Sequence, residues 1–245
     1  MNFEIIDNTF QVTVFFLAMT ADVVCWLLWR NRLFIILALA HACFMMGTLY
    51  FVLHLAIRGV VPQVFYVAEI SWISSYLFLH SYQIVRYQGR RPGLSWLPLI
   101  CGIGIAAVSM WSEIFGPALL STGAFAVVAG AITYVCVYQI LNNGRAGQDN
   151  NYVNDYTDNY ADYHTDHHAN HHRMNDMLLT DVCILLCVIL QVTLYDSSLF
   201  IHDYTKFSLY FGIDFVLTIS HAMLLPCTIW DVRRNLGGVK NNDVH

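Results

Sequence analysis

The chain has 245 residues, of which 57% are hydrophobic and only 12% are charged. That charged share is about half the share found in an average soluble domain, so an ordinary water-soluble fold is excluded. The net charge of −5 results from acids that are concentrated in one segment. It therefore identifies no partner, and we expect no nucleic-acid partner.

Seven apolar runs succeed one another along the chain, and each approaches the ~20 residues that cross ~30 Å of hydrocarbon. They cover residues 10–29, 33–57, 62–85, 94–115, 117–141, 177–195 and 204–230. Lipid cannot satisfy open backbone groups, and the runs lack the alternating polarity of a barrel, so only helices fit. We predict an all-α, polytopic transmembrane helical bundle with seven spans, forming a single domain over residues 1–245 in the lipid bilayer. If the turn signal Gly116-Pro117 does not separate the fourth and fifth runs, six spans result.

The basic residues are distributed unevenly between the two sides of the predicted bundle. Of the 12 lysines and arginines, all but Arg58 and Lys206 fall on one side. The positive-inside rule assigns that side to the cytoplasm. We therefore expect an outside N-terminus, a short cytoplasmic tail over residues 231–245, and a location in a bacterial cytoplasmic membrane.

Polar residues inside two of the spans recur at helical spacing. Such residues are costly in hydrocarbon and normally face the bundle interior or a water-filled cavity. Each set lies along one helical face, because the offsets are close to multiples of the 3.6-residue turn. The two stripes comprise Glu69, Trp72, Tyr76, His80 and Gln83 on the third span, and Tyr210, Asp214, Thr218 and His221 on the seventh.

These stripes and Asp22 of the first span predict one shared interior pathway for a small solute, a proton or a cation. At ~1.5 Å per residue, Asp22 and Asp214 lie near the midplane, with Glu69 nearer the outside and His80 and His221 in the inner half. The protein would act as a transporter or as a membrane sensor, and a sensor would need a cytoplasmic or membrane signalling partner. The alternative is that these residues only hold the helices together, at roughly 1 kcal/mol or less each.

A b-type haem redox protein is the alternative function, with axial ligands drawn from His41, His80 and His221. We rank it second, because a bis-histidine haem site does not require the acids that recur with these histidines. An enzyme is not expected, since the motifs for ATP hydrolysis, zinc proteolysis and serine hydrolysis are absent.

The segment 142–176 is rich in Asp, Asn, Tyr and His, and we expect a disordered cytoplasmic loop there. It holds five histidines, several of them four residues apart, which in a helix would place pairs on one face. Neutral imidazole binds borderline cations, so a transition metal is the expected ligand, with a plain tether as the alternative. The candidate metal ligands are His164, His167, His168, His171 and His172.

Overall fold

The structure is a computed structural model that describes the chain in six stretches. These are residues 3–59, 66–87, 93–111, 119–154, 164–198 and 206–240. Within them, only the backbone is described at residues 66, 119–120, 143–154, 164–177 and 234–240. The described chain is helical and contains no strand, which confirms the all-α prediction.

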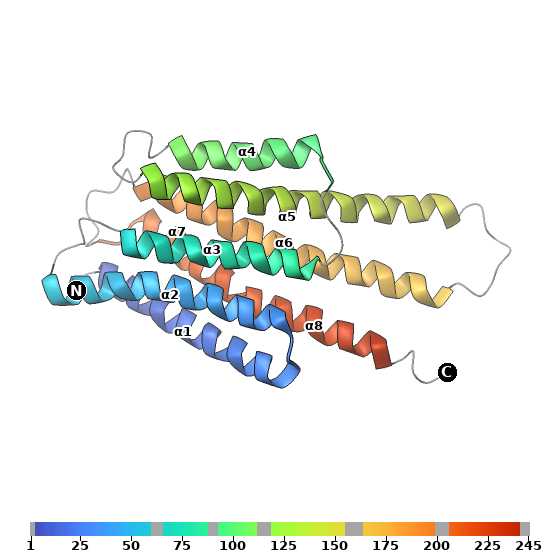
Figure 1. Cartoon of the computed structure of the whole chain (residues 1–245), viewed down its shortest axis with the longest axis horizontal. Helices are drawn as coiled ribbons and strands as arrows, with labels where there is room; N and C mark the ends of the chain where they lie inside the picture. The colour runs from blue at the N-terminus through green and yellow to red at the C-terminus, as the bar shows by residue number, and fades with distance from the viewer. Residues whose placement is uncertain are drawn as a thin grey trace.

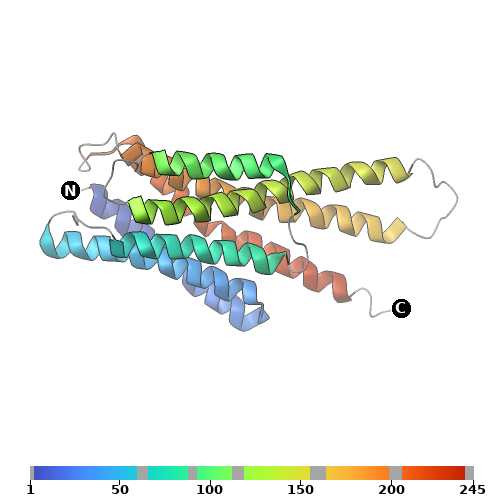
Figure 2. The same cartoon turned by 45° about the horizontal axis from the view of Figure 1, so that its top comes forward.

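The described stretches contain eight helices, which run roughly along one common axis and form an elongated bundle (Figure 1). They are α1 (Phe3–Trp29), α2 (Arg32–Arg58), α3 (Tyr66–Arg86), α4 (Trp96–Trp111), α5 (Leu119–Asn154), α6 (His164–Ser198), α7 (Leu209–Ala222) and α8 (Leu224–Lys240). Helix α1 begins at one end of the bundle and α8 ends at the other, in both views (Figures 1 and 2).

Among the residues that the structure describes, five segments are long and apolar enough to cross a bilayer, which indicates a membrane-embedded protein. They are Phe3–Trp29, Arg32–Arg58, Ser121–Asn142, Leu178–Ser198 and Leu209–Arg233. Helix α4 is apolar but shorter, at 16 residues. Helix α3 has 21 residues, but its polar stripe lowers its hydropathy, so it does not belong to this set.

Helices α7 and α8 form one bent rod that is interrupted at Met223. Pro226 lies one turn beyond Ala222, lacks a backbone N–H, and crowds the carbonyl group four residues before it. Pro226 therefore accounts for the interruption, which lies two residues after His221.

Helices α4 and α5 pack side by side through two glycines (Figure 1). A Cβ atom on Gly102 would lie 2.7 Å from the Gly130 carbonyl oxygen, and one on Gly130 would lie 2.9 Å from that of Gly102. These two glycines let the helices approach closely, since any side chain would push the backbones apart. The fourth and fifth apolar runs thus form two helices, although the turn at Gly116-Pro117 lies outside the described residues.

The predicted loop 142–176 is shorter than expected, because α5 continues to Asn154 and α6 begins at His164. Both helices project beyond the rest of the bundle (Figure 1). A polar composition rules out a hydrophobic core, but it does not prevent a helix from satisfying its own backbone hydrogen bonds. The predicted tail is also partly helical, since α8 extends to Lys240 and Val232 is buried.

The glycine contact gives a stability prediction with a matched control. Gly102→Ala should destabilise the protein by about 1–3 kcal/mol, because the new methyl group meets a backbone carbonyl that cannot rotate away. Gly104→Ala should be neutral or slightly stabilising, since a Cβ there has nothing within 4 Å. Thermal unfolding of both variants in the same detergent measures the difference, and equal melting temperatures would contradict the close packing.

Candidate functional site

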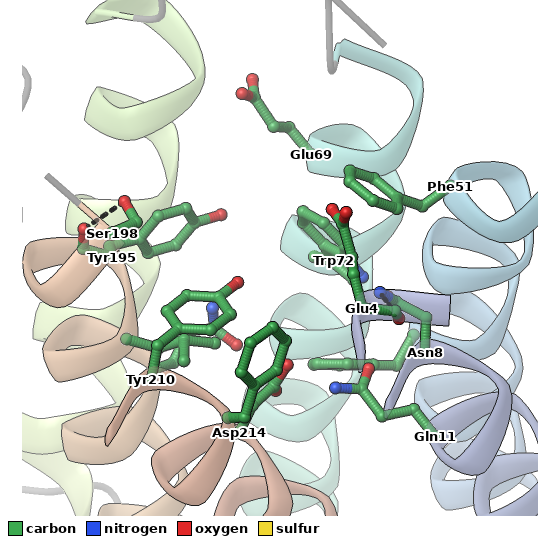
Figure 3. A pocket seen from close by; sticks show the side chains of 14 residues that line it. Glu4, Asn8, Gln11, Phe51, Glu69, Trp72, Tyr195, Ser198, Tyr210 and Asp214 are labelled. Carbon is green, nitrogen blue, oxygen red and sulfur yellow. Dashed lines mark hydrogen bonds between the residues drawn. The ribbon is translucent and has the colours of Figure 1, made fainter. Parts of the chain in front are cut away.

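A cavity of about 270 Å³ lies between α1, α2, α3, α6 and α7, at the end of the bundle where α1 begins. We call it the outer pocket. Glu4, Glu69 and Asp214 line it from three different helices (Figure 3). Tyr195 and Tyr210 lie across the pocket from Glu4 and Trp72 (Figure 3).

Neighbouring helices hold several of these lining side chains in place. The Ser121 hydroxyl of α5 donates a hydrogen bond to Glu69 Oε2. The Thr48 hydroxyl of α2 donates to Gln11 Oε1 at 3.3 Å, and the Gln11 amide is directed into the pocket (Figure 3). The outer pocket is therefore supported by hydrogen bonds behind its walls.

Trp72 forms part of the pocket wall because α2 has no side chain at Gly47. A Cβ atom on Gly47 would lie 2.7 Å from Trp72 Nε1 and 3.0 Å from the Ala68 carbonyl oxygen. The indole therefore lies flat against the backbone of α2. Any larger residue at position 47 would drive the ring towards the pocket.

Two carboxyl groups meet at the floor of the outer pocket. Asp7 of α1 and Asp214 of α7 are each only 7% exposed, and their side chains are neighbours. A carboxylate has no donor, so a hydrogen bond between them would form only when one of the two acids holds a proton. The pair is thus a place where one proton can be held or released.

A chain of buried hydrogen bonds leads from the pocket wall towards the middle of the bundle. The Tyr76 hydroxyl donates to Gln191 Oε1, which lines the pocket, at 3.2 Å. The same hydroxyl lies 3.3 Å from His221 Nε2. His41 Nε2 in turn lies 3.2 Å from the backbone carbonyl oxygen of His221, next to the interruption between α7 and α8. These contacts connect α2, α3, α6 and α7 in one network.

Asp22 and His41 form the innermost contact of this network, with Oδ2 and Nδ1 2.6 Å apart and neither side chain exposed. The carbonyl oxygen of His221 can only accept, so His41 Nε2 carries a hydrogen atom. A second proton then lies between Nδ1 and Asp22, either on the imidazole or on the carboxyl group. The pair consequently holds one transferable proton while it stays neutral overall.

Two buried polar atoms of this network make no hydrogen bond. Within the described part of the chain, Asp22 Oδ1 and His221 Nδ1 have no hydrogen-bond partner. When the Tyr76 hydroxyl donates to Gln191, His221 donates from Nε2 and its Nδ1 lone pair is available to accept a proton. Buried polar groups are normally satisfied, so these two atoms are sites where the network can take up a further hydrogen bond.

A separate ionic cluster joins α3, α6 and α8 at the opposite end of the bundle. Arg86 Nη2 lies 2.8 Å from Asp231 Oδ2, and Arg86 Nη1 lies 3.4 Å from Asp181 Oδ1. The Tyr87 hydroxyl donates to Asp181 and the Thr180 hydroxyl donates to Asp231. One guanidinium group therefore bridges two buried carboxylates from different helices.

The structure brings together most of the residues that the sequence singled out. Glu69, Trp72 and Asp214 line the outer pocket, Tyr76 and His221 belong to the buried chain, and Asp22 pairs with His41. Two residues are not brought into this network. His80 lies near Gln83 of its own helix, and the Thr218 hydroxyl donates to the backbone of Asp214.

Sequence reasoning missed the first turns of α1, which supply Glu4, Asp7 and Gln11. The first apolar run appeared to begin at residue 10, so the acids before it seemed to lie outside the membrane. The buried residues of α1 nevertheless recur three or four positions apart from the start of the helix, the spacing of one helical face. They are Glu4, Asp7, Gln11, Phe15, Ala18, Asp22 and Cys25.

The predicted metal ligands lie in the first turns of α6, from His164 to His172, where only the backbone is described. The helical backbone places His164 and His168 one turn apart, as the metal hypothesis requires. The transition-metal site itself stays a prediction.

The haem alternative stays a prediction. Both ring nitrogens of His41 are engaged, by Asp22 and by the His221 carbonyl group. His221 Nε2 lies against the Tyr76 hydroxyl, and His80 Nδ1 lies 3.4 Å from Gln83 Oε1. Of the three candidate ligands, His41 is therefore the least available for axial ligation of iron.

Comparison with family models, with curated proteins and with solved structures finds no match for the chain. The functional argument therefore rests on the geometry of the site.

The ionic cluster predicts a contrast between two variants. Arg86→Met should destabilise the protein by about 3–5 kcal/mol, because it leaves two buried carboxylates without their cation. Asp231→Asn should cost far less, since the amide oxygen still accepts from Arg86 and Asp181 keeps its partner. Chemical denaturation followed by tryptophan fluorescence measures both changes. A smaller loss for Arg86→Met than for Asp231→Asn would contradict this account.

Proposed function

We propose that this membrane protein binds a small solute in the outer pocket, and that binding is linked to the release of a proton held inside the bundle. In this proposal α3 and α4 join the five long apolar segments, the last of which is the rod of α7 and α8, to make seven spans. The N-terminus lies outside and the end of α8 lies in the cytoplasm. The outer pocket then faces the external solution, and the protein works as a transporter or as a sensor.

The observation that carries the proposal is the set of buried hydrogen bonds that joins the outer pocket to the His221 ring. It begins at Gln191 in the pocket wall and passes Tyr76 and His221 at 3.2 and 3.3 Å. The pair of Asp22 and His41 meets the backbone carbonyl group of His221, a contact that positions the pair but does not itself carry a proton. Holding helices together would not require the chain to start at a cavity. Intramembrane acids and histidines arranged in this way are typical of proton relays.

The protons held at the outer pocket and in the buried network support a link between solute binding and proton release. The acids Asp7 and Asp214 hydrogen-bond to each other only while one of them is protonated. A solute that pairs with Asp214 competes with that proton, which then leaves to the outside or moves inward. His221 Nδ1 is the nearest acceptor in the buried chain that has no partner in the described structure.

Transporter and sensor share this site and differ only in the step after binding. A transporter would open the buried chain to the cytoplasmic end, past the cluster around Arg86. A sensor would pass the change to a cytoplasmic or membrane signalling partner, for which the projecting ends of α5 and α6 are available. The histidines at the start of α6 would add a transition-metal response to either mode.

The proposed topology predicts the outcome of two reporter fusions. A reporter fused after Lys240 should be active only in its cytoplasmic form, because seven spans return the chain to that side. The same reporter fused after Gly59 should be active only in its external form, since two spans bring the chain back to the side of the N-terminus. Paired phosphatase and fluorescent-protein fusions measure this, and the same side for both positions would contradict the topology.

A second prediction tests the buried chain. A panel of small cations, anions and neutral solutes is added to the protein in weakly buffered nanodiscs, and proton release is followed with a pH dye. Tyr76→Phe keeps the ring but removes the relay hydroxyl, so proton exchange with the interior should slow by roughly a hundredfold.

Tyr82→Phe is the matched control, because its buried hydroxyl bonds to Thr228 at 2.8 Å and lies outside the chain. It should release protons like the unmodified protein. Equal rates in the two variants would remove the relay from the proposal. No binding and no proton release for any solute of the panel would overturn the proposed function.

A further inference from the structure

The charged residues that line the outer pocket are acidic. Glu4, Glu69 and Asp214 line it, and none of the residues described around it is a lysine, an arginine or a histidine. Asp7 is a further acid next to Asp214. An anion would be repelled here, and a neutral solute would supply no counter-charge to Glu69 or Asp214. A positively charged ligand fits this electrostatic setting.

The walls of the pocket are largely aromatic. Aromatic faces attract cations through their quadrupole, most strongly when the cation is an ammonium group without a tight hydration shell. A hydrated inorganic cation would gain little from such walls. The aromatic lining residues are Phe44, Phe51, Trp72, Tyr195, Tyr210 and Phe211.

The spacing of the acids argues against a bare metal ion. Among the residues that the structure describes, no three histidine, cysteine or acidic side chains come close enough to hold a metal. In Figure 3, Glu69 and Asp214 lie at opposite ends of the pocket, with Glu4 at its side. Such a spread suits a ligand that extends across the cavity and contacts the acids separately.

A buried hydrogen-bond donor in the pocket wall indicates a second chemical feature of the ligand. Gln11 is 3% exposed, Thr48 holds its oxygen, and its Nε2 makes no close hydrogen bond to a described residue, although the Asp214 carboxyl group lies next to it. That amide points into the pocket beside Asp214 (Figure 3). A buried N–H without a partner is costly, so a ligand oxygen at this point would stabilise the complex. The oxygen of a hydroxyl or carbonyl group can accept this hydrogen bond.

We propose that the outer pocket binds a small organic cation, an amine or quaternary ammonium compound that also carries a hydroxyl or carbonyl oxygen. The ammonium group lies among the carboxylates and aromatic rings, and the oxygen accepts from Gln11. A cavity of about 270 Å³ holds a molecule somewhat larger than benzene, which an engineered cavity of ~150 Å³ accommodates. This inference rests on the proposed function and names the class of its solute.

The test uses choline and its neutral isostere 3,3-dimethylbutan-1-ol, which has the same shape and hydroxyl group but no charge. The full chain is placed in phosphatidylglycerol nanodiscs, so that no lipid headgroup supplies an ammonium group. Calorimetric titration and thermal unfolding then measure binding. Choline should bind at least tenfold more tightly than the isostere and should raise the melting temperature.

Variants of the lining residues test whether choline binds in the outer pocket. Asp214→Asn and Glu69→Gln should each weaken choline binding at least tenfold and leave the weak binding of the isostere unchanged. Glu69→Gln serves as the second variant if Asp214→Asn does not fold. Trp230→Phe, at an exposed position of α8 away from the lining residues, should bind choline normally.

The outcomes separate this inference from the proposed function. Equal binding of choline and the isostere, or binding only of anionic or neutral solutes with proton release, would overturn the cation assignment and leave the proposed function standing. If nothing in the panel binds, both fail. The ammonium group could also come from a lipid headgroup. In that case phosphatidylethanolamine nanodiscs should raise the melting temperature of the unmodified protein but not of Asp214→Asn. Choline would then compete poorly with the lipid.

Discussion

Asp22 and His41 meet at 2.6 Å with neither side chain exposed, and this contact constrains how the helices of the bundle can pack. Charged groups taken out of water are tolerated only when a partner compensates them, so α1 and α2 must present these two residues to each other. The free nitrogen of His41 then needs an acceptor, which the interrupted backbone after His221 supplies. The position of α7 results from that requirement.

Buried acidic residues occur at both ends of the bundle, but their surroundings differ. At the cytoplasmic end of the proposed topology, Arg86 compensates Asp181 and Asp231, and the cluster joins three helices. At the other end, acids from α1, α3 and α7 line the outer pocket, and no lysine, arginine or histidine is among its described lining residues. A compensated cluster holds helices together, whereas acids that line a cavity can attract a ligand.

The polar stripes of the sequence were informative because helical spacing is enough to show that residues share a face. The residues of the α3 stripe lie at the outer pocket or in the buried network as far as Tyr76, while His80, one turn further, lies near Gln83 of its own helix and outside the network. The contribution of the first turns of α1 was missed, since hydropathy alone places Glu4 and Asp7 before the span. Their buried positions depend on the neighbouring helices, and no local pattern of charge reports those neighbours.

The sequence by itself determined the helical class, the apolar segments, and the acids and histidines that require an interior partner, because these depend on hydropathy and period along one chain. Only the tertiary structure decided which partners meet. The pairing of Asp22 with His41 joins residues 19 positions apart, and the contact of Tyr76 with His221 joins residues 145 positions apart. Such pairings depend on how helices rotate and pack against one another, which is set by shape, as at Gly47 and Gly102.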